Sequence, residues 1–309
     1  MASARVVPDS TAQAVVADSG SADSQHPQHL LLTLLGDYWM SDGAIVPSGA
    51  LVDLLSEFGI TQTGARAALS RLSKRGLLSS NKEGRRTFYR LTEHARHVLT
   101  TGLERIVSFG ADPQPWDGQW TCVAFSVPEQ QRTRRHQLRV RLRWLGFAPL
   151  YDGVWVSPRS RAGEATSVLE ELSVGAATVL VGPELASGTE YGRPIDAWDL
   201  SGVREQYLAF IERMRPIRSR LAAGDVSGSE ALQARTRVMD EWRWMPNADP
   251  ELPDELLPRE WPRADARALF RSVYDGLGEP AAARVREIVS CHAPEFAEHV
   301  SAHTVSGIQ

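Results

Sequence analysis

One stretch of the sequence decides the fold: GITQTGARAALSRLSKRGLLSSNKEGRRTFYRLT, at residues 59–92. Within it, Thr61 has the side chain of a helix N-cap, and Gly76 suits the position just past a helix C-terminus. The apolar spacing between them predicts a helix over residues 62–75 with one apolar and one polar face. The residues after this helix alternate around a polar turn at Gly84, which predicts a β-hairpin.

The flanking segments complete a small module. Apolar residues at helical spacing predict one helix over residues 30–38 and a second over residues 48–58. Thr92 is a suitable N-cap for a further helix that follows the hairpin. Three helices followed by a β-hairpin is the order of a winged helix-turn-helix, which we place at residues 29–110.

The charge of this module differs from that of the rest of the chain. Residues 60–105 contain ten basic and three acidic side chains, a net charge of +7, whereas the whole chain has a net charge of −4. Such asymmetry is typical of a nucleic-acid-binding module joined to an acidic body. The alternative interpretation is a solvated helix face that binds nothing.

Helix and hairpin together supply the candidate contacts to double-stranded operator DNA. Gln62, Thr63 and Arg66 lie in the first turns of the predicted helix, where recognition helices present side chains to the major groove. Arginine pairs with guanine edges in two hydrogen bonds, and glutamine does so with adenine. The other basic candidates are assigned to phosphates: Arg71, Lys74 and Arg75 on the helix, and Lys82, Arg85 and Arg86 on the hairpin.

The remaining sequence predicts two further parts and an α+β fold class. Residues 116–185 have a predicted element order close to β-α-β-α-β, with one or two strands at residues 149–156. This order predicts a ferredoxin-like α/β sandwich that has lost or shortened a strand. Residues 195–300 are helical in pattern, with the apolar stripe interrupted at Pro216. Residues 1–28 lack periodicity and predict a disordered tail.

Composition excludes several classes of protein. The apolar runs are far shorter than the ~20 residues that span a bilayer, and the N-terminal 28 residues lack a secretory signal pattern. Two cysteines cannot build a disulfide framework. We therefore expect a cytoplasmic protein with no membrane contact. No catalytic motif, metal site or cofactor site is predicted, and irregularly spaced histidines near Cys291 do not form a zinc motif.

Several motifs resemble PaaX-type repressors. The N-terminal motifs are ARAALSRL at residues 65–72, GLL at residues 76–78 and GRRTFYRLT at residues 84–92. The motifs further along the chain are GVWVSP at residues 153–158, AWDL at residues 197–200 and LLPREWP at residues 256–262. The resemblance implies a homodimeric repressor of a catabolic operon on a pseudo-palindromic operator. It also implies release from DNA by an acyl-CoA effector, phenylacetyl-CoA in the best-known member, and it assigns residues 195–300 to effector binding and dimerisation. In the helix before Asp249, Asp240 and Glu241 occupy a place where many relatives are expected to have a histidine.

Candidate effector contacts lie in two regions. Residues 132–143 hold six arginines, of which Arg134, Arg135 and Arg139 are assigned to CoA phosphates, since guanidinium matches phosphate geometry. The same helix could also bind a DNA backbone or form only a solvated face. The candidates for an aromatic effector pocket are Trp242, Trp244 and Trp261, for which helix-packing core is the alternative.

A second functional class stays open at this point. The central region resembles the ferredoxin-like fold of the CRISPR-associated adaptation nucleases, so the chain could be a nucleic-acid-binding protein or a metal-dependent nuclease. Those nucleases place an aspartate at the end of their first strand to hold a metal. Residues 123–127 read VAFSV, so that ligand is missing here and two-metal phosphodiester chemistry is disfavoured.

Overall fold

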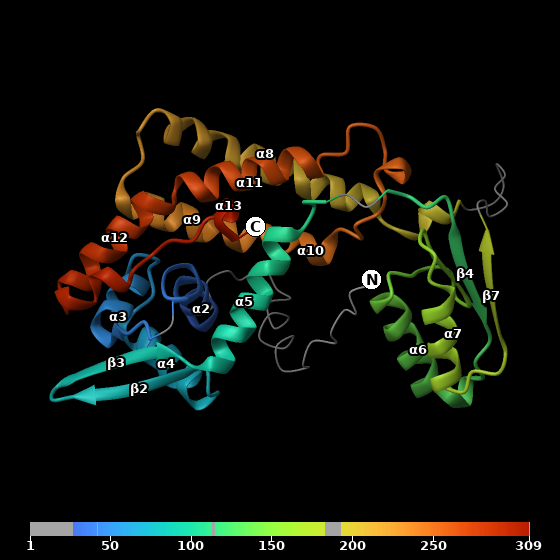
Figure 1. Cartoon of the computed structure of the whole chain (residues 1–309), viewed down its shortest axis with the longest axis horizontal. Helices are drawn as coiled ribbons and strands as arrows, with labels where there is room; N and C mark the ends of the chain where they lie inside the picture. The colour runs from blue at the N-terminus through green and yellow to red at the C-terminus, as the bar shows by residue number, and fades with distance from the viewer. Residues whose placement is uncertain (1–26, 42, 113–114, 183–192, 309) are drawn as a thin grey trace. The chain divides into compact units, whose positions relative to one another are not determined.

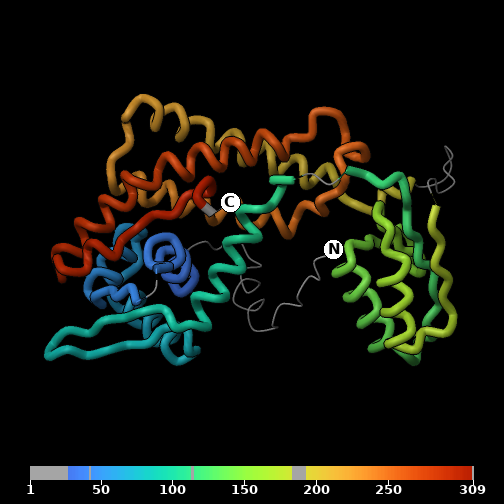
Figure 2. Tube along the Cα trace, viewed as in Figure 1, coloured from blue at the N-terminus to red at the C-terminus, as the bar shows by residue number. Residues whose placement is uncertain are grey.

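Two compact units form the structure. The computed structural model describes residues 27–41, 43–112, 115–182 and 193–308. The first unit joins residues 1–111, 208–245 and 264–309, and the second joins residues 112–207 and 246–263. The chain therefore passes from the first unit into the second and returns twice, as its trace shows (Figure 2). Most of the predicted disordered tail lies outside the described residues, and Pro27 begins the first helix, three residues earlier than predicted.

The N-terminal half of the first unit has the predicted order of helices and strands (Figure 1). Its elements are α2 (Pro27–Tyr38), β1 (Val46–Pro47), α3 (Ser48–Ser56), α4 (Gln62–Lys74), β2 (Leu78–Glu83), β3 (Arg86–Leu91) and α5 (Glu93–Ser108). The three strands form an antiparallel sheet in the order β1-β3-β2. Thr61 accepts a hydrogen bond from the Gly64 N–H, and Thr92 accepts one from the Ala95 N–H, each at 3.2 Å. Both predicted N-caps are therefore confirmed.

Helices from the C-terminal part of the chain complete the first unit. They are α9 (Gly228–Trp242), α11 (Arg263–Gly276), α12 (Gly278–Ser290), α13 (Val305–Ile308) and the second half of α8 (Leu200–Ala222). Leucines on α2, α3 and α4 are almost fully buried, and α2 and α3 pack directly against α9 and α12. No helix in the described residues is long and apolar enough to cross a membrane.

An aromatic stack runs through the core of this unit. The ring of Trp242 lies parallel to that of Phe270 at 4.8 Å between centroids, and Phe270 stacks on Tyr274 at 5.4 Å. The Trp242 Nε1 donates a hydrogen bond to the Ile106 carbonyl at 3.3 Å. Because burial of an aromatic ring with a satisfied N–H is strongly stabilising, this stack fixes α5, α9 and α11 against one another.

Pro216 does not interrupt its helix, contrary to the prediction from sequence. The helix α8 continues through Pro216 to Ala222. A proline inside a helix removes the hydrogen bond to the carbonyl four residues earlier, which here belongs to Glu212. Glu212 and Pro216 are both exposed, so a water molecule can donate to the Glu212 carbonyl in place of the missing N–H.

A buried arginine joins the N-terminal half of the first unit to its C-terminal helices. The Arg235 guanidinium on α9 is fully buried and donates to the carbonyls of Tyr274 (2.6 Å) and His303 (2.7 Å). It also lies 3.7 Å from the ring centroid of Tyr274 and 5.9 Å from that of Tyr38. The Tyr274 hydroxyl in turn donates to the buried Asp37 carboxylate at 2.6 Å.

The second unit contains a four-stranded antiparallel sheet with helices on one face. Its elements are β4 (Trp120–Phe125), α6 (Arg132–Trp144), β5 (Ala148–Tyr151), β6 (Val154–Ser157), α7 (Ala162–Glu171) and β7 (Ala177–Gly182). The strand order is β5-β6-β4-β7. Residues 149–156 thus contribute to two strands, so the element order is β-α-β-β-α-β with no strand lost. Together with the first unit, this confirms the predicted α+β class.

The central strands β4 and β6 are covered on both faces, whereas Leu180 and Val181 of the edge strand β7 are 52% and 48% exposed. Val123 and Trp155 on one face pack against Leu138 and Leu142 of α6. Trp120, Cys122 and Val156 on the other face pack against partly buried residues of the sheet and of the segment before it, and against residues from segments further along the chain. The first group is Trp116, Leu150 and Val154, and the second is Ile195, Ala197, Trp198 and Leu256. Strands buried on both faces explain why this region reads as continuous apolar runs instead of strict alternation.

A buried ion pair lies in the C-terminal segment of this unit. Arg263 donates to both oxygens of the Asp249 carboxylate at 2.9 and 2.8 Å, and the Tyr207 hydroxyl donates to the same carboxylate at 2.6 Å. A two-bond arginine–carboxylate pair is among the strongest hydrogen-bonded arrangements in proteins. The ion pair therefore holds the two ends of residues 249–263 together, and the Tyr207 hydrogen bond attaches this segment to the rest of the second unit.

The buried cluster around Arg235 predicts two opposed effects of pH on stability. Burial, partly offset by the Arg235 charge, raises the pKa of Asp37 from 3.8 to about 6. Its contribution to stability is complete below pH 3.8 and is lost as the pH rises through about 6. Burial and the Arg235 charge lower the pKa of His303 from 6.5 to about 4, so its contribution is present above pH 6.5 and is lost as the pH falls through about 4.

Two variants should separate these contributions in urea denaturation at a series of pH values. Between pH 6 and about 4, Asp37→Asn should lose free energy of unfolding on acidification more steeply than wild type. The extra slope should reach at most about 1.4 kcal/mol per pH unit, the value for one proton. His303→Gln should shift the slope in the opposite direction. Profiles parallel to wild type in both variants would contradict the assigned pKa shifts.

Candidate nucleic-acid interface

The helix α4 separates its residues into a buried face and a fully exposed polar face. Ala65, Ala68, Leu69 and Leu72 are buried, and α4 packs with them against α2 and α3. Every candidate DNA contact on this helix is exposed: Gln62, Thr63, Arg66, Arg71, Lys74 and Arg75. The 3.6-residue period thus places all six side chains where a duplex could reach them.

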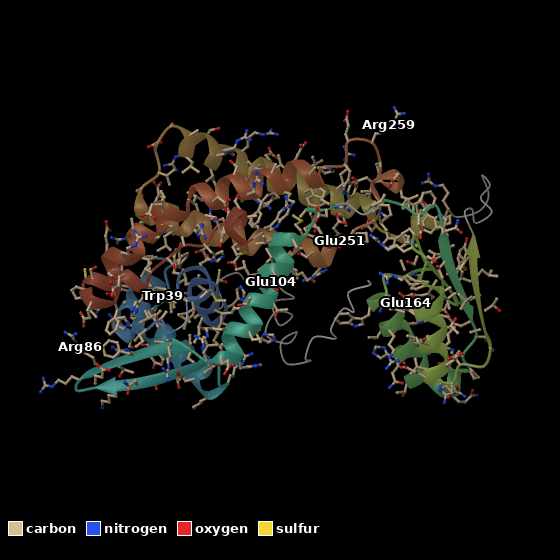
Figure 3. The ribbon with its side chains drawn as sticks, in the orientation of Figure 1. Trp39, Arg86, Glu104, Glu164, Glu251 and Arg259 are labelled. Atoms are coloured by element: carbon tan, nitrogen blue, oxygen red, sulfur yellow. The ribbon has the colours of Figure 1, made fainter. Side chains whose placement is uncertain are left out.

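The hairpin presents the other three candidates at its end. Lys82, Arg85 and Arg86 are all exposed, and Gly84 takes the left-handed backbone conformation (φ +62°) that the tight turn requires. Figure 3 labels Arg86 at this end of the hairpin. The register, in which Glu83 pairs with Arg86, closes the hairpin around a two-residue turn.

The positive charges of this surface are almost uncompensated. Among the described residues, the nine candidates make a single ion pair, from Arg86 to Glu295 at 3.6 Å. Both of those side chains are more than half exposed, so the pair contributes about 0–1 kcal/mol and is easily exchanged for another anion. Exposed cations without internal partners are the electrostatic requirement for binding a polyanion.

Two ion pairs hold α3, and through it α4, against the C-terminal helices. The Arg284 guanidinium on α12 donates to Glu57 at 2.6 Å, and the Ser229 hydroxyl donates to the same carboxylate. Burial alone would raise the pKa of the Glu57 carboxyl, but these two hydrogen bonds outweigh it, so the pKa is lowered. His292 pairs with Asp53 at 2.6 Å. These contacts join residues far apart in the chain, and no local sequence pattern indicated them.

The candidate effector arginines lie on α6 and already have internal partners. Arg134 donates to the Gln131 side chain at 2.9 Å, Arg135 donates to the Val127 carbonyl at 2.6 Å and pairs with Glu129, and Arg139 pairs with Asp152. The carboxylates of Glu129 and Asp152 are 59% and 85% exposed. Such surface pairs are weak enough to be replaced by a phosphate.

The three candidate tryptophans occupy different environments. Trp242 is fully buried in the aromatic stack of the first unit, whereas Trp244 is 40% exposed. Trp261 belongs to the second unit, as do the arginines of α6, and its ring meets that of Tyr207 at 6.1 Å between centroids. The role of Trp242 in the core matches the alternative interpretation of the sequence, in which it packs helices.

Asp240 has a structural partner that the sequence did not reveal. Its carboxylate lies 3.2 Å from the His29 Nε2 and 3.7 Å from the Arg243 Nε. His29 lies on α2 and Asp240 on α9, so this contact adds to the attachment made by Arg235. In the part of the chain that the structure describes, no group of three or more His, Cys, Asp or Glu side chains could hold a metal ion.

Comparisons with known proteins agree on one family over most of the chain. The model described as "PaaX-like protein" matches residues 26–95, the "PaaX protein central Cas2-like domain" matches residues 113–191, and the "PaaX-like protein C-terminal domain" matches residues 198–287. These matches follow the chain order of the N-terminal module, the four-stranded unit and the C-terminal helices. The chain belongs to the PaaX family.

One curated relative and one solved structure extend this finding. The chain is 27% identical over 264 residues to the transcriptional repressor PaaX of Escherichia coli, which covers 84% of this chain and 82% of that protein. The solved structure of the uncharacterized protein Rv0674 from Mycobacterium tuberculosis superposes with a TM-score of 0.51 at 22% identity. It covers 84% of this chain and 97% of that one, and it supports the fold alone.

Proposed function

We propose that this protein is a cytoplasmic transcriptional repressor that binds operator DNA through α4 and the β2–β3 hairpin. The observation that carries the proposal is the set of nine exposed polar and basic side chains on these two elements. In the described residues only one of the nine, Arg86, makes an ion pair, and that pair with Glu295 is weak. The similarity to a transcriptional repressor over most of the chain supports the proposal. In this proposal residues 27–108 are a winged helix-turn-helix and the second unit is a ferredoxin-like sandwich.

The positions on α4 suggest a division of labour. Gln62, Thr63 and Arg66 lie in its first two turns and are assigned to base edges in the major groove. Arg71, Lys74 and Arg75 follow at the other end of the helix and are assigned to phosphates, which fix register without reading sequence. The hairpin cations are assigned to the backbone or minor groove beside them.

We further propose that the repressor acts as a homodimer on a pseudo-palindromic operator. One module offers only a few phosphate contacts, so two modules are needed for high affinity at physiological salt. If each protomer neutralises about four phosphates, the slope of log affinity against log salt should be roughly −7. Closed two-fold symmetry would then match the symmetry of the operator.

The effector in this proposal is an acyl-CoA thioester, with Arg134, Arg135 and Arg139 as the phosphate contacts. The carboxylate partners of Arg135 and Arg139 are exposed, and Arg134 donates to the neutral Gln131 side chain, so the phosphates of CoA can replace these partners at small cost. To empty a nearly saturated operator, the effector must favour the DNA-free state by about 5.5 kcal/mol. No cofactor is required for this mechanism.

Base reading and backbone binding should separate by mutation. Arg66→Ala should weaken operator binding by roughly 1–3 kcal/mol and binding to random duplex very little, because a base contact distinguishes sequences. The matched control Arg85→Ala should weaken both about equally and reduce the salt slope by about 1. Fluorescence anisotropy with labelled duplexes at several salt concentrations measures the affinity for operator, the affinity for random duplex and the salt slope. Equal losses on both duplexes for Arg66→Ala would refute the assignment.

Release by the effector provides an independent prediction. Phenylacetyl-CoA or another aryl-CoA, and not the free acid, should dissociate the wild-type complex, and Arg134→Ala/Arg135→Ala/Arg139→Ala should bind operator normally but resist release. The control Arg132→Ala/Arg141→Ala removes two other surface ion pairs of the same helix and should respond like wild type. Normal release of the triple variant, or release by a free acid alone, would contradict the proposed phosphate contacts.

A further inference from the structure

One face of the hairpin lies against residues from the far end of the chain. Arg86 and Phe88 are alternate residues of β3, so their side chains lie on the same face of the strand. The Phe88 ring meets the Phe296 ring at 5.3 Å between centroids, and the Arg86 Nη1 lies 3.6 Å from the Glu295 Oε1. Two neighbouring residues of the short 3-10 helix η4 (Pro294–His299) therefore meet this face of the hairpin.

Phe88 is the main apolar contact of the outer part of the hairpin. Among residues 79–90, which include the turn, Phe88 is the one buried side chain, with 4% of its surface exposed. A two-stranded hairpin is marginally stable in water unless it packs against another element. The position of the hairpin cations therefore depends on what Phe88 packs against.

The segment of residues 291–300 is itself attached to the N-terminal module on both sides of η4. Before η4, the His292 Nε2 lies 2.6 Å from the Asp53 Oδ2 on α3. After η4, the Ser301 N–H donates to the Tyr38 carbonyl at the end of α2, at 3.2 Å. Because both sides are attached to helices that pack against α4, η4 links the position of the hairpin to that of α4.

The charge of this segment argues against a direct contact with DNA. Residues 291–300 contain Glu295 and Glu298 and no lysine or arginine, and both glutamates are exposed. Carboxylates are repelled by a phosphate backbone, which binds lysine and arginine instead. The segment can therefore affect DNA binding only through the hairpin that it contacts.

We propose that residues 291–300 are part of the DNA-binding unit and that Phe296 is a positioning residue for the hairpin cations. Phe296 holds Phe88, and through β3 it determines where the cationic end of the hairpin lies beside α4. The consequence for DNA rests on the proposed repressor function, whereas the contact itself can be tested without DNA.

Hydrogen exchange in the full-length protein without DNA measures the contact. Phe296→Ala should speed exchange of the amides that pair β2 with β3 at least about threefold, because the ring pair is lost, and should change the α4 amides by less than about twofold. Phe296→Leu keeps an apolar side chain and should restore most of the protection. The control Glu295→Gln removes only the exposed ion pair, so its amides should exchange as in wild type.

DNA binding in two backgrounds measures the consequence. Phe296→Ala should weaken binding to operator and to random duplex at least about threefold each and reduce the salt slope, since displaced cations neutralise fewer phosphates. In the background Lys82→Ala/Arg85→Ala/Arg86→Ala, the same substitution should weaken binding by less than about 1.5-fold, because no hairpin cation is left to position.

Three results for Phe296→Ala would overturn the proposal: unchanged exchange in the hairpin, equally faster exchange in the hairpin and α4, or equal losses of DNA affinity in both backgrounds. The last two would mean that Phe296 only stabilises the fold. If Phe296→Ala does not fold, Phe296→Val takes its place with the same expected pattern. A wild-type protein that binds no duplex would contradict the repressor function, and the exchange data would still decide whether Phe296 holds the hairpin.

Discussion

The buried guanidinium of Arg235 is the constraint on which the first unit depends. A charge without access to water is very unfavourable unless it has polar partners, and here the two Nη atoms donate to the carbonyls of Tyr274 and His303. The Tyr274 ring lies 3.7 Å from the guanidinium and the Tyr38 ring 5.9 Å from it. Those partners come from α2, α11 and the C-terminal segment. Arg235 therefore makes the N-terminal module and the C-terminal helices one folded body.

This attachment has a consequence for how DNA would be bound. Since α2 and α3 are fastened to α9 and α12 by His29–Asp240, Asp53–His292 and Glu57–Arg284, the buried faces of the module are already occupied. What remains exposed is the polar face of α4 and the end of the hairpin. A change in the C-terminal helices would thus reach α4 through α2 and α3, which pack against both.

Local chemistry made much of this structure predictable, and long-range packing made the rest unpredictable. Thr61, Thr92 and Gly84 act within three or four residues of their own positions, so helix starts and the hairpin turn could be read from sequence, and helical periodicity correctly placed the α4 candidates outward. Arg235 looked like an ordinary helix residue, and for Trp242 an effector pocket and a packing role both stayed open, because the partners of both residues lie far away in the chain. Pro216 suggested a break, yet its exposed position lets water compensate for the missing bond.

The central claim is that α4 and the hairpin, and not the arginine helix α6, bind the operator. A crystal structure of the protein bound to its operator duplex tests this most directly. The account predicts the N-terminal turns of α4 in the major groove, with Arg66 hydrogen-bonded to a base edge and the hairpin cations at phosphates. A complex in which the duplex lies along residues 132–143, with the polar face of α4 left in solvent, would contradict it.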